Sequence, residues 1–424
     1  MQQGEDRLTK QPVAPRTRLW QRPLPLQRQD SNRNDFIDKE FISRLKGLPN
    51  ILPEGLEWLD YRPEMCPAIA GFYHKNFILG SGDPPKQFQE YISRRMSANP
   101  PHLILMIADT LCKEGKSDVR TADGRDATIV GMMISEAFDV INQGKSVPTL
   151  TIGGLAIAEP WRGMGLVLNF VKRGASRVSG EHMHLFNLKK DRRLFPCAEL
   201  SVWWYPLKPA TCKMMTLFRL DPGPPSTLIT ALCDRVSEEY AALPCREMTF
   251  CDVDTVCRML REEAANFSLA RFWTSEHVAR WLLPKDDVQF SYVVTDETGT
   301  KDLDFFSFHI VSYCVPNSKS IDQTECLENE KGEEKVGTRE IRMAVPGYLT
   351  TQHTRKEDIV KFIMHAAKQA NVDYIHGYGA FSYEETFNNL GFTKNENEVH
   401  YLQMFNWETR SFKGEEIGLA WIQF

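Results

Sequence analysis

Residues 156–174, which read AIAEPWRGMGLVLNFVKRG, join an apolar strand-like run to a helical segment through a turn that contains two glycines. Arg162, Gly163 and Gly165 stand at this joint. A strand that passes directly into a helix commits the stretch to an α/β unit, and glycines there permit backbone conformations that other residues avoid. The first amides of a helix have no partner within it, and they attract anions such as phosphate. We therefore predict either a plain tight turn or a phosphate-binding turn.

Length and composition predict a two-domain globular protein. The chain has 424 residues, too many for one ordinary core. Its 51 basic and 56 acidic residues give a net charge of -5, which offers no basis for nucleic acid as the main partner. No apolar run approaches the roughly 18–20 residues that cross a bilayer, and the start MQQGEDRLTK lacks the apolar core of a signal peptide. The ten cysteines include no Cys-x-x-Cys pair, so we expect reduced thiols, no metal and a cytoplasmic location.

The periodicity of apolar residues predicts an arm over residues 1–45, followed by two α+β halves, 46–220 and 221–424, with a Pro-rich linker at 219–228. The two halves share an order of helices, strands, helix and strand, although no repeat is visible in the residues themselves. The expected helices are 66–77, 85–96, one opening at Gly165, 252–267, 275–284, 356–370 and 383–392, and the expected strands are 102–112, 126–140, 148–158, 288–296, 302–315, 340–349, 373–379, 400–407 and 418–424. In the helix after Gly165, we expect the stripe of Val167, Val171, Gly174 and Val178 to face the sheet.

The turn and the strand before it resemble the acyl-CoA-binding unit of the Gcn5-related N-acetyltransferase superfamily. Arg162 and Gly165 match the superfamily's pattern of Arg or Gln, two residues, Gly, one residue, then Gly or Ala, and Val167 departs from the final small residue. Gly153 and Gly154 would ease a β-bulge in the strand. Such a bulge turns strand amides toward a thioester carbonyl and makes them an oxyanion hole.

Stretches in both halves are similar to the eukaryotic protein N-myristoyltransferase family, whose members are two fused halves of this fold. The similarity runs from about Leu19 to the end of the chain. The stretches that carry it are LWQRPLP, LPEGLEW, WWYPLKP, WLLPKDDVQFSYVV with DFFSF, YEETFNNLGF, MFNW and IGLAWIQF. The resemblance implies two lobes related by a pseudo-twofold axis, an acyl-CoA-binding lobe at 46–220 and a peptide-binding lobe at 221–424.

The resemblance also implies an activity. A long-chain acyl group, myristoyl, would pass from acyl-CoA to the N-terminal glycine amine of a peptide or protein, in a monomeric enzyme without a metal or prosthetic group. The oxyanion hole would be the backbone amides of Gly154 and Leu155. The residues implied in acyl-CoA binding are Leu19, Trp20, Leu155, Ala156, Ile157, Arg162, Gly163, Met164, Gly165, Leu166 and Val167. Met164 and Gly165 replace basic residues of the family's loop, and each missing charge-assisted hydrogen bond costs about 1.5–3 kcal/mol.

The acceptor end of the site departs from the family. The resemblance assigns the general base to the terminal carboxylate, here that of Phe424, yet the alignment places the family's last residue near Ile422. The carboxylate would then overshoot by about 6–7 Å unless the strand slides. The resemblance implies peptide contacts at Trp204, Tyr313 and Tyr348, and Trp204 replaces the family's histidine.

Two further functions stay open because of these departures. One is a family member that binds acyl-CoA or peptide with weak or lost turnover. The other is an N-acetyltransferase for small acyl groups, because the short RGMG turn is more typical of that class. Four histidines could serve as the base by their chemistry, although buried structural histidines are more common: His309, His353, His365 and His376.

Overall fold

The computed structural model describes residues 51–77, 82–98, 104–111, 117–177, 182–187, 196–209, 226–237, 240, 242–316, 338–405 and 411–420. The predicted arm, with Leu19 and Trp20, lies outside the described residues, and so does Phe424.

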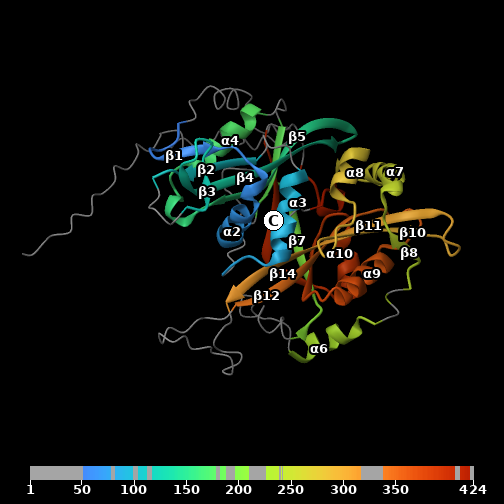
Figure 1. Ribbon diagram of the computed structural model, residues 1–424. Coiled ribbons are helices and arrows are strands. Elements are labelled where there is room, and N and C mark those ends of the chain that lie inside the picture. Colours follow the sequence, from blue (N-terminus) through green and yellow to red (C-terminus); the bar gives the residue numbers. More distant parts are fainter. Residues whose placement is uncertain are drawn as a thin grey trace, which may run out of the picture.

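The first half of the chain forms strands around two helices and then a strand–helix–strand unit (Figure 1). Its elements are β1 (Leu56–Leu59), η2 (Pro63–Met65), α2 (Cys66–Asn76), α3 (Lys86–Ala98), β2 (Ile104–Asp109), β3 (Val119–Arg120), β4 (Asp126–Asn142), β5 (Lys145–Ile157), η4 (Glu159–Trp161), α4 (Leu166–Arg177), β6 (His182–Asn187) and β7 (Pro196–Pro206).

The second half follows the same plan after one additional helix. Its elements are α6 (Ser226–Arg235), β8 (Cys245–Glu247), η6 (Phe250–Asp252), α7 (Val253–Ala264), β9 (Leu269–Arg271), α8 (Ser275–Trp281), β10 (Gln289–Thr295), β11 (Asp302–Pro316), β12 (Thr338–Leu349), α9 (Lys356–Gln369), β13 (Tyr374–Tyr378), α10 (Tyr383–Leu390), β14 (Thr393–Phe405), η7 (Gly414–Glu416) and β15 (Ile417–Gly418). Because α6 begins at Ser226, the last residues of the predicted linker 219–228 are helical, and residues 219–225 lie outside the described part.

The two halves share one sheet and exchange their last strands. The strand order is β1-β2-β4-β5-β6-β14-β7-β13-β12-β11-β10-β8. Each half contains a corresponding parallel pair, β5 with β6 and β12 with β13, and in the second half β15 also pairs in parallel with β9. At the centre, β7 of the first half pairs with β13, and β14 of the second half pairs with β6. This nearly symmetric order supports the prediction of two related halves, and the exchange ties each half to the other.

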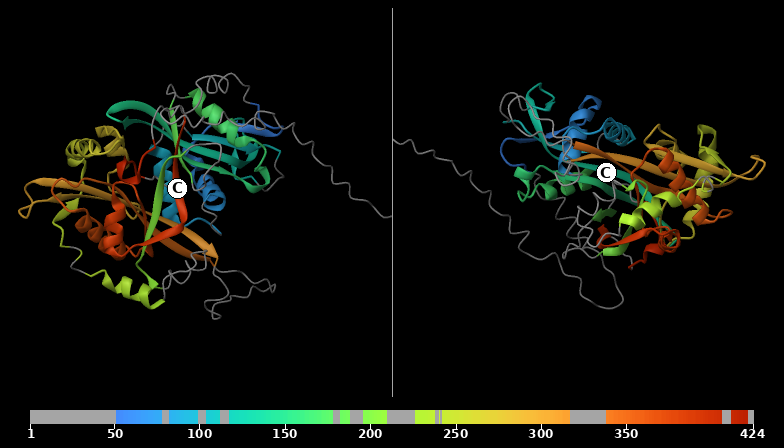
Figure 2. Two further views of the ribbon diagram at one scale, coloured as in Figure 1. Left: turned by 180° about the vertical axis from the view of Figure 1, so that it is seen from behind. Right: turned by 90° about the horizontal axis from the view of Figure 1, so that it is seen from below.

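Helices cover both faces of the first-half sheet (Figures 1 and 2). The buried side chains of α2 and α3 pack on one face of β4 together with Met132 and Ile134. On the opposite face, Leu166 and Phe170 of α4 pack with Met133. Strand residues alternate between faces, so β4 lies between these two layers.

The buried face of α4 differs from the predicted stripe. Leu166 and Phe170 are 1% and 0% exposed, whereas Val167 is 43% exposed. Gly174, which the stripe and the observed face share, lies so close to the sheet that a Cβ there would come within 2.9 Å of the Met133 side chain. Leu166 and Phe170 are larger than the valines, and burying them turns the helix by one residue, about 100°. The side chain of Val171 is not described, and Val178 lies outside the described residues.

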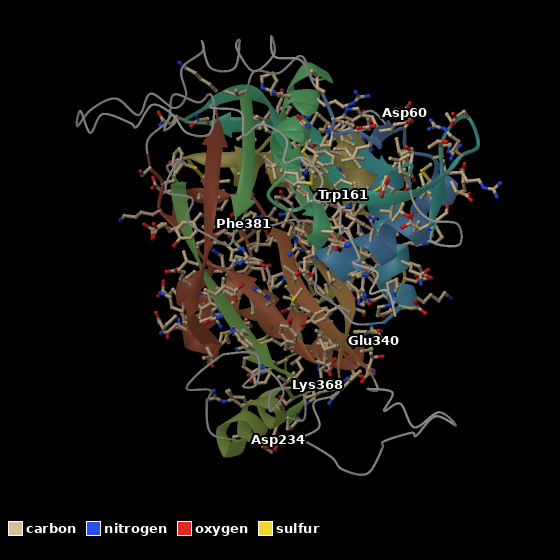
Figure 3. All side chains as sticks on the ribbon, turned by 90° about the vertical axis from the view of Figure 1, so that its left-hand side faces the viewer. Asp60, Trp161, Asp234, Glu340, Lys368 and Phe381 are labelled. Carbon is tan, nitrogen blue, oxygen red and sulfur yellow. The ribbon has the colours of Figure 1, made fainter. Side chains whose placement is uncertain are left out.

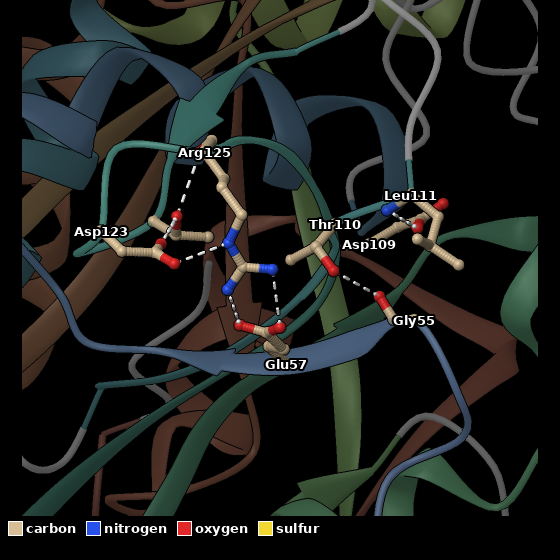
Figure 4. A network of polar contacts seen from close by, with 8 residues as sticks. Gly55, Glu57, Asp109, Thr110, Leu111, Asp123 and Arg125 are labelled. Carbon is tan, nitrogen blue, oxygen red and sulfur yellow. Dashed lines mark hydrogen bonds and ion pairs between the residues drawn. The ribbon is translucent and has the colours of Figure 1, made fainter.

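Polar contacts secure both ends of the molecule. In Figure 4, Arg125 forms a bidentate ion pair with Glu57 of β1, with N–O distances of 3.0 and 2.8 Å, and also contacts Asp123 at 2.7 Å. This links β1 to the turn between β3 and β4. At the other end, the Lys368 ammonium of α9 donates to two backbone carbonyls, that of Cys233 within α6 and that of Val236 directly after α6. Figure 3 shows Lys368 near Asp234 of α6, far from Trp161 at the turn before α4.

Candidate functional site

Strand β5 is bulged at the glycine pair. Its pairing with β4 passes from Ile134–Gly154 to Ser135–Ile152, so Gly153 is an extra residue on β5. The Tyr73 hydroxyl of α2 donates to the Gly154 carbonyl at 3.1 Å. Burial raises the pKa of Tyr73 well above its usual value, which keeps the hydroxyl protonated as a donor. The predicted bulge is therefore present, and a buried hydrogen bond from Tyr73 of α2 fixes the Gly154 carbonyl beside it.

Beyond the bulge, no described strand pairs with β5 on the side of β6. Its pairing with β6 extends only as far as Ile152–Leu185. The Ala158 amide donates to the carbonyl of Val130 in β4. Since antiparallel pairing alternates along a strand, Gly154 and Ala156 direct their backbone groups toward β4, and Leu155 and Ile157 direct theirs into the gap beside β6. Of the two predicted oxyanion donors, the amide of Leu155 thus faces this gap and that of Gly154 faces β4.

Arg162 closes the end of this gap. Its Nε donates to the Ile157 carbonyl at 3.0 Å, and its Nη2 donates to the Asn76 carbonyl at the end of α2 at 3.4 Å. Both contacts are with backbone oxygens. The structure therefore gives Arg162 a role in holding the turn against β5 and α2. Its contact with phosphate stays a prediction.

The turn before α4, residues 163–167, forms an open cradle of backbone amides. Gly163 and Gly165 have φ of 82° and 81°, and a Cβ at either glycine would have no neighbour within 4 Å. Among the described residues, no acceptor is assigned to the amides of residues 163–167. Met164 and Val167 are each 43% exposed. The cradle therefore presents bare amides and an exposed apolar rim to solvent, the arrangement that binds anions at helix N-termini.

The second half contains the counterpart of this bulge and turn. The Thr350 amide donates to the Phe305 carbonyl, as Ala158 does to Val130 in the first half. The pairing of β11 with β12 also shifts by one residue, between Phe306–Leu349 and Phe308–Pro346. The bulged segment that follows leads into α9, as β5 leads into α4. Both bulged strands thus lead through a turn into a helix, although the bulge lies next to Leu349 in β12 and next to Gly154, four residues before Ala158, in β5.

A carboxylate of this chain occupies the amides of the second turn, the one before α9. Buried Asp304 accepts hydrogen bonds from the amides of Gln352, His353 and Thr354 at 2.7–2.9 Å, and from the Thr350 hydroxyl at 2.9 Å. The residue one before Val130 in the first half is apolar Ile129, and the residue at the same distance from the bulge is Met132, which is also apolar. In the second half, Asp304 therefore supplies the anion that the amides before α9 bind. In the first half, the amides before α4 are left for a ligand.

We predict that Asp304→Asn lowers the free energy of unfolding by about 2–3 kcal/mol, because three amides lose a charged acceptor and a hydrogen bond to a charged group contributes about 1.5–3 kcal/mol. Urea unfolding followed by circular dichroism measures the loss. Asp296→Asn, at an exposed turn whose carboxylate also accepts amides, is the matched control and should cost less than 1 kcal/mol. Equal losses in the two variants would contradict the closed-turn interpretation.

Two of the predicted peptide contacts lie together. Trp204 of β7 and Tyr313 of β11 both touch Tyr374 of β13: the Trp204 and Tyr374 rings lie 5.9 Å apart, and the Tyr313 and Tyr374 hydroxyls are hydrogen-bonded at 2.9 Å. Tyr348, the third, packs edge-on against Trp273 at 4.6 Å. Tyr348 belongs to a different part of the molecule, a cavity between the two halves.

This cavity of about 60 Å³ contains charged residues that the sequence analysis did not select. It is lined by Tyr91, Arg94, Arg95, Arg271, Trp273, Trp281, Leu282, Val288, Gln289, Ser307, His309, Gly347, Tyr348 and Ala420. The lining residues come from α3, β9, α8, β10, β11, β12, the loops beside α8 and the segment after β15. The adjacent Arg94 and Arg95 in an otherwise amphipathic helix were the available sequence signal.

The four candidate histidines differ in burial. His309 lies in the cavity and stacks on Tyr91 with the ring centroids 5.9 Å apart. Burial, together with the charges of Arg95 and Arg94, lowers the pKa of His309 to about 3. Burial likewise lowers the pKa of His376 to about 4. His353 and His365 lie at the surface of α9 and the turn before it. The two buried imidazoles are therefore neutral at pH 7.

We predict that His309→Gln flattens the pH dependence of stability. Between about pH 6.5 and pH 3 the unfolded chain binds a proton at His309 that the folded protein does not, so stability falls as pH decreases across this window. The loss approaches about 1.4 kcal/mol per pH unit. Urea unfolding between pH 7 and pH 5 should give a shallower slope for His309→Gln than for His365→Gln, the surface control. Identical slopes would contradict a neutral buried His309.

Two kinds of feature are missing from the part of the chain that the structure describes. No group of three or more His, Cys, Asp or Glu residues is placed to hold a metal ion. Separately, none of the described helices combines the length and apolarity needed to cross a membrane.

Comparisons with known proteins point to one family. Residues 230–418 match the family model of the myristoyl-CoA:protein N-myristoyltransferase C-terminal domain. A glycylpeptide N-tetradecanoyltransferase of Dictyostelium discoideum is 22% identical over 397 residues, 91% of this chain and 87% of that protein. A probable glycylpeptide N-tetradecanoyltransferase of Caenorhabditis elegans is 26% identical over 187 residues, and this match spans only 37% of its length.

A solved structure has the same architecture. Saccharomyces cerevisiae N-myristoyltransferase with bound myristoyl-CoA superimposes with a TM-score of 0.70 over 94% of each chain, at 15% identity. This likeness confirms the predicted α+β fold of two related lobes.

Proposed function

Because this chain is a member of the N-myristoyltransferase family, we propose that it transfers a myristoyl group from myristoyl-CoA to the N-terminal glycine amine of a peptide or protein. Myristoyl-CoA is a co-substrate here, and no prosthetic group takes part. We further propose that the protein acts as a cytoplasmic monomer with no nucleic-acid partner, with its acyl-CoA lobe at 46–220 and its peptide lobe at 221–424.

The contrast between the two turns carries this proposal. The amides before α9 bind the buried carboxylate of Asp304, whereas those before α4, from Gly163 to Val167, have no acceptor among the described residues. We assign the CoA pyrophosphate to the open turn. Exposed Met164 and Val167 would lie beside the ligand. The other proposed contacts with acyl-CoA are Leu19, Trp20, Leu155, Ala156, Ile157, Arg162 and Leu166.

The gap beside β5 suits the thioester. Its carbonyl would accept from the amide of Leu155, which points into the gap, with Gly154 at the bulge beside it. Backbone donors that are fixed before the reaction stabilise the developing oxyanion without reorganisation. The amine attacks the thioester carbonyl, the carbon–sulfur bond breaks, and CoA leaves as the thiol. The amine must first lose a proton, and for this step we retain the proposed carboxylate at Phe424, which lies outside the described residues.

We place the peptide where the two halves meet, because Trp204 belongs to β7 of the first half and Tyr313 to β11 of the second. Trp204 and Tyr313, which meet around Tyr374, form one proposed contact surface, and Tyr348 in the cavity forms another. Trp204 and Tyr313 are aromatic and only partly buried, so they offer apolar contact area with few hydrogen-bonding groups, whereas Tyr348 is buried.

Two measurements test the function. Calorimetry with myristoyl-CoA and acetyl-CoA should show tighter binding of myristoyl-CoA, and equal or tighter binding of acetyl-CoA would favour a small-acyl acetyltransferase. A single-turnover assay with myristoyl-CoA and peptides that begin with glycine should then yield acylated peptide. Binding of myristoyl-CoA without any acylated product over hours would instead identify a binding module that has lost turnover.

A further inference from the structure

A tyrosine of α2 stands between the two strands at the bulge. The Tyr73 side chain is 0% exposed. Its hydroxyl donates to the Gly154 carbonyl of β5 at 3.1 Å and accepts a hydrogen bond from the Ile134 amide of β4. Ile134 and Gly154 are paired directly beside the register shift. The hydroxyl therefore connects β4 to β5 at the point where the extra residue enters β5.

The carbonyl that Tyr73 holds belongs to the same peptide group as the Leu155 amide. A peptide group is planar and trans, so its N–H points in the direction opposite to its C=O. The Gly154 carbonyl faces β4 and Tyr73, and the Leu155 N–H faces the gap beside β6, where we place the thioester carbonyl. A contact that fixes this carbonyl thus also fixes the direction of the proposed oxyanion donor.

Helix α2 holds the other end of the gap as well. Arg162 donates to the Ile157 carbonyl of β5 and to the carbonyl of Asn76, three residues after Tyr73 on α2. The segment of β5 that borders the gap is therefore attached to α2 at both ends, directly through Tyr73 and indirectly through Arg162. Packing fixes Tyr73 itself, because its ring meets that of Phe77 edge-on at 5.9 Å and lies in the buried layer between α2, α3 and β4.

We propose that Tyr73 is a positioning residue for acyl transfer, whose hydroxyl orients and polarises the peptide group between Gly154 and Leu155. The inference rests on the proposed function and deepens it by naming the side chain that prepares the oxyanion donor. When the amine attacks, negative charge develops on the thioester oxygen, and an N–H that is already aimed at this oxygen stabilises the charge without reorganisation. A hydrogen bond to the carbonyl also strengthens the N–H of the same peptide group as a donor, by about 10–30%. Tyr73 neither gains nor loses a proton in this step.

Tyr73→Phe removes the hydroxyl and keeps the ring. The Ile134 amide and the Gly154 carbonyl can then bond directly, since they belong to paired residues. This rotates the peptide group toward β4 and turns the Leu155 N–H away from the thioester. The single-turnover rate of acylation should fall about tenfold, less than the 10²–10³-fold that loss of an oxyanion donor costs. The Kd of myristoyl-CoA should stay within about twofold, because the pyrophosphate binds at the turn before α4.

Tyr205→Phe is the matched control. Tyr205 of β7 is also 0% exposed, and its hydroxyl donates to a backbone carbonyl, that of Leu232 in α6, at 2.7 Å. Each variant removes one buried hydroxyl, so the two should lose similar stability in urea unfolding. Only Tyr73→Phe should slow acylation. Rates that fall equally in the two variants, or in neither, would overturn the proposal.

Infrared spectroscopy of bound myristoyl-CoA, with an isotopic label at the thioester carbonyl, tests the proposal without turnover. A stronger hydrogen bond lowers the stretching frequency of a carbonyl. The label should therefore absorb at a higher frequency in Tyr73→Phe than in the unmodified protein or in Tyr205→Phe, and an unchanged frequency would overturn the proposal.

A ring-fluorinated tyrosine at position 73 keeps the proposal testable if Tyr73→Phe fails to fold. Its hydroxyl is a stronger donor on nearly the same ring, so the label should absorb at a lower frequency than in the unmodified protein, and an equal frequency would overturn the proposal. The infrared measurements also decide the question if the unmodified protein yields no acylated peptide. Failure of myristoyl-CoA to bind the unmodified protein would instead overturn the proposed function, and this inference with it.

Discussion

Replacing Gly165 by Asp should weaken the binding of myristoyl-CoA at least 100-fold. The new carboxylate would stand among the bare amides before α4, as Asp304 stands among those before α9. It would occupy donors that the pyrophosphate needs and repel the phosphates, and two unit charges about 4 Å apart near a protein surface interact by about 4 kcal/mol. Asp tolerates positive φ better than most residues, so we expect the fold to survive. Calorimetric titration with myristoyl-CoA measures the loss.

Gly124→Asp is the matched control for this variant. Gly124 lies in the turn between β3 and β4 with φ of 83°, close to the 81° of Gly165, and a Cβ at either position has no neighbour within 4 Å. Both variants therefore impose the same backbone strain and add the same charge. Only Gly165→Asp should impair acyl-CoA binding, while the two should lose similar stability in urea unfolding. A Kd within threefold of the unmodified protein for Gly165→Asp would place the phosphates elsewhere.

The strand, the bulge and the helix start at this site could be predicted from the sequence, because each depends on residues that are neighbours in the chain. Apolar alternation marks β5, the glycine pair at 153–154 marks the bulge, and Gly165 marks the start of α4. The buried face of α4 was predicted one residue out of phase, since a stripe of valines competed with the larger Leu166 and Phe170. Periodicity indicates that a helix has an apolar face, whereas packing against β4 selects which apolar residues are buried.

The remaining features depend on contacts between distant segments. The exchange of β7 and β14 at the centre of the sheet pairs strands from different halves, and hydrophobic pattern alone does not specify a strand's partner. Asp304 meets amides almost fifty residues later in the chain. The cavity collects Arg94 from α3 and Arg271 from β9. In the sequence, each of these charged residues looks like an ordinary surface residue, and only the fold reveals their burial.

The second large effect concerns the buried ion pair between Glu136 and Arg271. Arg271→Met should lower the free energy of unfolding by about 3–5 kcal/mol, because it leaves Glu136 buried without its partner. The methionine still fills the space between Phe138 and Trp273, so loss of packing contributes little. Glu136→Leu should cost a similar amount by leaving Arg271 unpaired. Both side chains are less than 10% exposed, so solvent does little to screen the remaining charge.

The double variant Glu136→Leu with Arg271→Met shows how much of each single loss comes from the charge left without its partner. With neither charge present, no member of this pair is left buried without its partner, and we expect a loss of less than about 2 kcal/mol, well below the sum of the single variants. Urea unfolding of all four proteins gives the coupling energy of the cycle. Additive losses would show that the two charges do not depend on each other.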